Sequence, residues 1–107
     1  MAMTEDISLL PRGEEPPEAD FSLVITDSAM EPLIPRGSRV YVSSRSPLRE
    51  METGLFLCEG RVLCRRWCED YNGALILLGG DESRREDSIY LDREQRRRCL
   101  CLGKVLI

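Results

Sequence analysis

The residues best suited to chemistry lie in one short stretch, Asp27-Ser28-Ala29-Met30-Glu31-Pro32. Ser28 is a candidate nucleophile, and the neighbouring Asp27 carboxylate is a conceivable base. The chain has no histidine, which excludes every Ser–His and Cys–His arrangement. Its single lysine, Lys104, lies close to the C-terminus. Nucleophilic chemistry in this chain would therefore need a base other than histidine.

The five cysteines are the other group that could carry chemistry. Cys99 and Cys101 would share one face of a strand, and Cys64 and Cys68 are also evenly spaced. Cys-x-Cys and Cys-x₃-Cys match the usual zinc-binding spacings poorly. We therefore expect no metal and no cofactor, with the cysteines reduced and packed as small hydrophobic side chains.

The elements that must position the stretch are strands. Val24-Ile25 before it and Val40-Tyr41-Val42 after it are β-branched or aromatic, as in a half-buried strand. Pro32 and Pro35 lack a backbone N–H and Gly37 tolerates a left-handed backbone, so neither strand continues through. The stretch is therefore expected in a loop between two strands.

The rest of the chain follows the same pattern and predicts a mainly β domain. Turn signals fall at Glu59-Gly60 and at Asn72-Gly73, the latter being a strong hairpin signal. Residues 81–87 and 93–98 are charged and are expected to form surface loops. The expected strands are 21–26, 38–43, 54–59, 61–69, 74–79, 88–91 and 99–107.

Composition limits the class of protein. The 107 residues suffice for one domain, and the proline- and acid-rich residues 1–20 suggest a flexible tail or linker before it. A net charge of -4 argues against direct nucleic-acid binding, which needs a basic face. There is no apolar run of membrane-spanning length and no signal sequence at the N-terminus. We therefore expect a cytoplasmic protein without a membrane partner.

Three motifs in this chain resemble, in order, those of the LexA-like and signal-peptidase-like serine peptidases (the S24 type). Met30-Glu31-Pro32, with the Leu-Ile-Pro-x-Gly that follows, resembles the nucleophile segment. The stretch 55–67 resembles the hairpin that carries the family's lysine, and residues 102–107 resemble its final Gly-Lys-Val strand. The resemblance covers residues 21–107 and implies the LexA C-terminal fold of mixed β-strands with little helix.

The resemblance also implies that the catalytic dyad is lost. The family's nucleophilic serine aligns with Ala29, and its general-base lysine aligns with Arg65, 36 residues later. Alanine has no nucleophile, and arginine does not deprotonate in proteins. By the same resemblance, Met30, Glu31 and Pro32 belong beside a peptide cleft. Trp67 is expected to pack against the core, although at a groove it could instead anchor a bound peptide.

The sequence thus predicts a catalytically inactive peptidase-like domain, of phage-repressor-like ancestry by resemblance, that binds a protein or peptide segment by strand addition. The C-terminal strand stays apolar to Ile107, which favours a homodimer through it. One alternative is an active serine-type peptidase, self-cleaving or not, with Ser28 as nucleophile. Another is the C-terminal portion of a DNA-binding repressor whose reader domain lies elsewhere.

Overall fold

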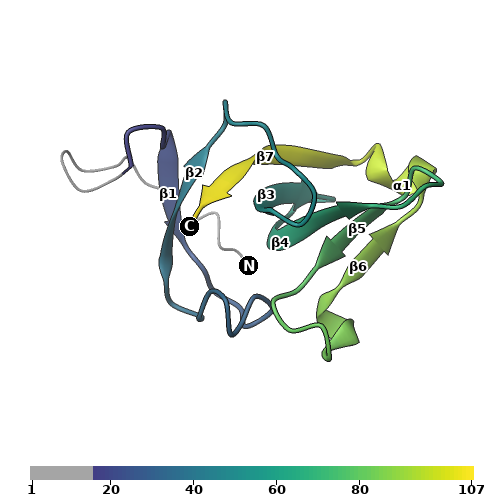
Figure 1. Ribbon diagram of the computed structural model, residues 1–107, viewed down its shortest axis with the longest axis horizontal. Coiled ribbons are helices and arrows are strands. Elements are labelled where there is room, and N and C mark those ends of the chain that lie inside the picture. Colours follow the sequence, from purple (N-terminus) through teal and green to yellow (C-terminus); the bar gives the residue numbers. More distant parts are fainter. Residues whose placement is uncertain (1–15) are drawn as a thin grey trace.

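The computed structural model describes residues 16–107, which form one seven-stranded antiparallel sheet with little helix (Figure 1). The strand order is β1-β2-β7-β3-β4-β5-β6. The elements are β1 (Phe21–Val24), β2 (Arg39–Ser43), β3 (Thr53–Cys58), β4 (Arg61–Glu69), β5 (Leu75–Leu78), the 3₁₀ turn η2 (Arg85–Asp87), β6 (Ile89–Leu91), α1 (Arg93–Arg96) and β7 (Cys99–Leu106). The prediction of a mainly β domain is confirmed, and every predicted strand is present.

The two predicted hairpins are also confirmed. Glu59 and Gly60 join β3 to β4 with φ angles of 51° and 82°, as a tight hairpin turn requires. Asn72 and Gly73 lie in the longer loop between β4 and β5. There the Asp70 carboxylate accepts backbone hydrogen bonds from Asn72 and Ala74, at 2.9 and 3.0 Å. This Asx-type arrangement holds the loop closed.

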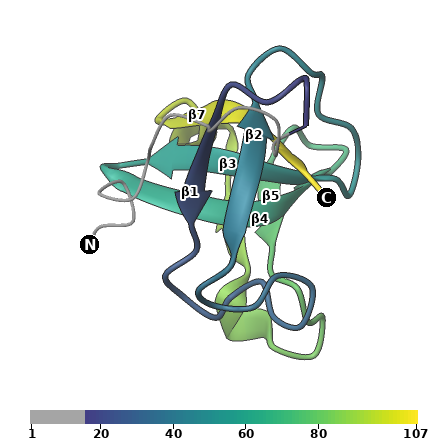
Figure 2. The same ribbon diagram turned by 90° about the vertical axis from the view of Figure 1, so that its left-hand side faces the viewer.

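The sheet bends so that β1 and β2 run across β3 and β4 and face them (Figure 2). The main core fills the space between these two parts and is built from both. Its fully buried members include Leu23, Val42, Leu55 and Val105. A second core lies on the other face of β3 and β4, where Phe56, Leu63, Leu75 and Leu77 pack together. The central hairpin is therefore covered on both faces.

β7 is the strand that joins the two parts of the sheet (Figure 1). Residues Lys104–Leu106 pair with β2, whereas Cys99–Leu102 run beside β3. At the crossing point the backbones approach closely, because a Cβ at Gly103 would lie 2.6 Å from the Ser43 carbonyl oxygen. Glycine is therefore the residue that fits this junction.

The described chain differs from the sequence-based expectations in two backbone segments and in the state of two cysteines. Residues 93–98 were expected to be a loop, but Arg93–Arg96 form one helical turn with a complete capping box from Asp92 and Gln95. Residues 1–15 of the predicted tail lie outside the described residues. Asp20, which we assigned to that tail, bonds to β2 through the Val42 carbonyl and receives two hydrogen bonds from Ser44.

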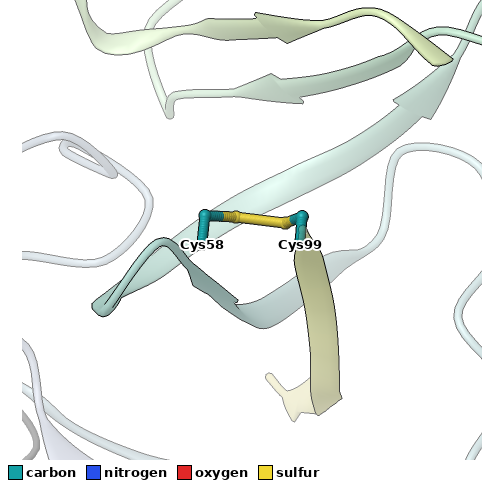
Figure 3. The surroundings of a disulfide bond; sticks show 2 residues. All are labelled: Cys58 and Cys99. Carbon is teal, nitrogen blue, oxygen red and sulfur yellow. A yellow bond between two sulfur atoms is a disulfide. The ribbon is translucent and has the colours of Figure 1, made fainter. Parts of the chain in front are cut away.

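The expectation that all five cysteines are reduced thiols is wrong. Cys58 and Cys99 form a disulfide that joins the end of β3 to the start of β7 (Figure 3). They are register partners in the sheet although they are 41 residues apart in the chain. The spacing of the cysteines in the sequence does not predict this pairing, because the pairing arises where β7 runs beside β3. Cys64, Cys68 and Cys101 are free.

Candidate functional site

The loop between β1 and β2 carries the stretch from which the sequence analysis began. Its ends are closed by backbone hydrogen bonds from Ile25 to Ser38 and from Gly37 to Ile25. Within it, two turns follow each other, in which Glu31 bonds to Ser28 and Ile34 bonds to Met30. The prediction of a loop rather than a continuing strand is confirmed.

Ala29 and Arg65, which come from this loop and from β4, contact opposite oxygens of a single carboxylate. Asp27 Oδ1 accepts a hydrogen bond from the Ala29 backbone N–H at 3.2 Å. Asp27 Oδ2 lies 4.0 Å from Arg65 Nη1. Ala29 and Arg65 are each 5% exposed, so both positions are closed to solvent. Asp27, which the sequence suggested as a conceivable base for Ser28, bridges the loop and β4 in the structure, and its role as a base stays a prediction.

The Arg65 guanidinium is anchored by backbone oxygens on two elements. Its Nε donates to the Asp87 carbonyl and its Nη1 donates to the Cys64 carbonyl, both at 2.9 Å. Burial lowers the pKa of Arg65, while the nearby Asp27 carboxylate opposes that shift. Burial also raises the pKa of the neighbouring Cys64 thiol to about 12. A permanent cation beside an inert thiol holds the loop and η2 against β4, and neither group supplies a base or a nucleophile.

Gly79 and Gly80, at the end of β5, pack against the same loop. The Gly80 N–H donates to the Ala29 carbonyl at 2.9 Å. A Cβ at Gly79 would lie 2.7 Å from the Ala29 carbonyl oxygen, and one at Gly80 would lie closer still to that of Met30. These contacts, and the hydrogen bond that the Asp87 carbonyl accepts from Arg65, were not predicted from the sequence. Two consecutive glycines directly after an apolar strand were the available signal of close backbone approach.

The remaining predicted site residues do not line one cleft with Ala29. Met30 is fully buried in the main core, so its side chain offers no surface to a peptide. Trp67 is half-buried and packs against the second core. Glu31 accepts a backbone hydrogen bond from Arg36 at 3.0 Å, and Pro32 is exposed. Ser28 is half-buried in the loop, with its carbonyl used in the first turn.

No model of a known protein family matches this chain, and no curated protein matches it. Residues 16–107 contain no group of three His, Cys, Asp or Glu side chains placed to hold a metal ion. Among the same residues, no helix has the length and apolar character needed to cross a bilayer. The geometry of the residues themselves must therefore indicate what the molecule does.

An open hollow of about 380 Å³ lies beside the end of β7 and is the surface that we consider for binding. Leu33, Met51 and Ile107 line it, and these are three of the six large apolar side chains exposed in the described chain. Lys104 and Glu52 form an ion pair of 3.3 Å in its lining. Leu33 follows Pro32 directly, so the loop that carries Ala29 also shapes this hollow.

Proposed function

We propose that this chain is a non-catalytic relative of the LexA-like serine peptidases that binds a segment of another protein. The observation that carries the proposal is the bridge from Ala29 through Asp27 to Arg65. Two positions 36 residues apart in the chain, chosen by motif, are linked in space by one carboxylate. Both are buried, and their side chains are a methyl group and a guanidinium.

The absence of a reactive pair at these positions favours binding over catalysis. A Ser–Lys dyad needs a hydroxyl and a lysine that can lose its proton. Arg65 remains a cation, and its contacts to two carbonyls fix it in a structural role. The mainly β architecture and the loop between β1 and β2 agree with the resemblance but are shared by many folds.

We expect the purified protein to remain intact during prolonged incubation at alkaline pH, where a lysine-based peptidase would be most active. Intact-mass spectrometry would reveal any fragment from self-cleavage, and a denatured carrier protein would report cleavage of other chains. The matched control is Ser28→Ala, which removes the remaining candidate nucleophile in the loop. Fragments that form in the parent protein and disappear in Ser28→Ala would show an active peptidase and refute the proposal.

The partner segment that we propose is extended, apolar and acidic. The hollow beside β7 offers Leu33, Met51 and Ile107 as apolar contacts. Its lining contains two cations, of which Lys104 is paired with Glu52 at 3.3 Å, whereas Arg66 donates to the Gly79 carbonyl and lies 3.9 Å from Glu82. An acidic residue in the partner segment would pair with Lys104 in place of Glu52.

We expect a phage-displayed library of random heptapeptides to yield apolar sequences containing Asp or Glu on this protein. A selected peptide should shift the amide resonances of Leu33, Met51 and Lys104, and Leu33→Asp should weaken its binding at least tenfold, because it places a charge in the apolar contact. Tyr71→Asp is the matched control, since Tyr71 is 97% exposed and lies outside this hollow. Failure to select peptides, or shifts confined to another face, would contradict this site.

The homodimer through the C-terminal strand stays a prediction, and the strand pairing of β7 restricts where a second copy can add. Lys104–Leu106 are already paired with β2, whereas no described strand pairs with Cys99–Leu102 on the side away from β3. Leu100 in this open stretch is 59% exposed. We therefore propose Cys99–Leu102 as the part of β7 where a second copy would add. Cytoplasmic location likewise stays a prediction.

A further inference from the structure

The Cys58–Cys99 disulfide lies beside a hollow of about 260 Å³ at the turn end of the β3–β4 hairpin. Cys58 is part of the lining of this hollow, and Cys99 is not. Leu63, Ile89 and Leu91 form its apolar surface. The hollow therefore gives a small molecule access to Cys58 rather than to Cys99. This observation is independent of the proposed function.

The charged side chains around this hollow favour the binding of an anionic small molecule. Arg61 is the register partner of Cys58 across the hairpin, and both Arg61 and Arg98 line the hollow. Glu59 is the one carboxylate in the lining, and it is 3.5 Å from Arg98 Nη1. The lining thus carries two positive charges and one negative charge. Charged surfaces of this kind raise the local concentration of ions of opposite sign.

We propose that Cys58 is a site of thiol–disulfide exchange with a small anionic thiol of the glutathione class. The thiolate of the small thiol attacks Sγ of Cys58, a new sulfur–sulfur bond forms between the two sulfur atoms, and the Cys58–Cys99 bond breaks. Its electron pair leaves on Cys99, which becomes a thiolate. A second thiolate then attacks the mixed disulfide, which releases the oxidised small disulfide and leaves Cys58 reduced. The reverse sequence, driven by the oxidised small disulfide, restores the bond.

Exchange at Cys58 would act on the start of β7. Cys99–Cys101 pair with β3 alone, since β2 contributes partners from Lys104 onward. The disulfide is the covalent tie at that end of the strand (Figure 3). Its reduction leaves these residues held by backbone hydrogen bonds on one side. The redox state of the surrounding thiol pool would therefore set how firmly the first half of β7 is held.

Cys101 provides the matched control thiol. It lies on the same strand two residues after Cys99, and its sulfur is 3.9 Å from the Gly103 carbonyl oxygen. Burial raises the pKa of the Cys101 thiol, which reduces the thiolate fraction near neutral pH. Cys101 is also absent from the lining of the hollow. Cys101→Ser should therefore leave the exchange reaction unchanged.

The test compares the rates at which glutathione and the neutral thiol 2-mercaptoethanol reduce the disulfide of the full chain, followed by acid quenching and mass spectrometry. The double variant Arg61→Glu/Arg98→Glu should slow reduction by glutathione about five- to tenfold at low ionic strength, with a smaller effect in 0.5 M salt. Reduction by 2-mercaptoethanol should change less than twofold. Arg36→Glu/Arg97→Glu is the matched charge control, because it changes the net charge by the same amount and both residues are exposed and lie outside this hollow.

The position of the glutathione adduct gives a second, independent readout. Peptic digestion of the acid-quenched intermediate should place the adduct on Cys58 rather than on Cys99. An adduct mainly on Cys99 would overturn the proposal. So would a double variant in which reduction by glutathione and reduction by 2-mercaptoethanol are slowed equally. So would a parent protein in which mass spectrometry finds Cys58 and Cys99 as free thiols after exposure to oxidised glutathione.

Discussion

Replacing Arg65 with methionine is expected to destabilise the protein by about 2–3 kcal/mol, because it leaves the buried Cys64 carbonyl and the half-buried Asp87 carbonyl without their donor. These are the oxygens of Cys64 and Asp87, each 2.9 Å from the guanidinium. The loss of the Asp27 ion pair should add little, since Asp27 is 42% exposed and the pair distance is 4.0 Å. Urea unfolding followed by circular dichroism would measure the change.

Two further substitutions separate the hydrogen bonds of the Arg65 guanidinium from its positive charge and from the general effect of replacing an arginine on β4. Arg65→Lys keeps the positive charge but loses the planar fork, so it should restore part of the stability and bond to one carbonyl at most. Arg61→Met, at an exposed position on the same strand, should change stability by less than about 0.5 kcal/mol. An Arg65→Met protein as stable as the parent would show that the guanidinium does not hold the loop to β4.

Gly80→Ala is expected to cost about 3 kcal/mol, which is the second large effect. The added methyl would overlap the Met30 carbonyl and lie 2.9 Å from that of Glu31, so the backbone must move. That movement would weaken the hydrogen bond from Gly80 to Ala29. Because Met30 is a fully buried core residue, the displacement should reach the main core as well. Thermal and urea unfolding would both report the loss.

The comparison for Gly80→Ala is Gly37→Ala. Gly37 has a φ angle of 91° but no atom within 4 Å of an added Cβ. Its replacement therefore tests backbone strain without a steric clash and should cost about 1 kcal/mol. If the two variants lost the same stability, close packing between Gly80 and the loop would not be the reason for the glycine.

The sequence predicted the strands well because their signals are local. Apolar β-branched runs and turn residues such as Glu59-Gly60 specify where a strand begins and ends without knowledge of its partner. α1 was missed although the spacing Asp92-x-x-Gln95 is that of a capping box, because the four arginines between 93 and 98 were interpreted as a solvated loop. The capping-box spacing was present in the sequence, but the high charge of residues 93–98 was given more weight.

The contacts of the candidate site were harder to predict because they join distant segments. Ala29 and Arg65 were identified by motif, but the bridging position of Asp27 depends on the turn that follows it. Asp87 contributes a backbone oxygen, which no side-chain pattern reveals. The burial of Met30 and the pairing of Cys58 with Cys99 likewise follow from how the sheet bends.

The central position of β7 has a consequence for how the molecule is made on the ribosome. Among the described strands, β1 and β2 emerge from the exit tunnel first, but their only sheet neighbour outside their own hairpin is β7, which is translated last. Until then the β1–β2 hairpin can meet β3 and β4 only across the main core, without the strand that hydrogen-bonds to both, and incompletely paired intermediates of this kind are prone to aggregation. A ribosome stalled a few codons before β7 is therefore expected to display a nascent chain that is digested easily by added protease.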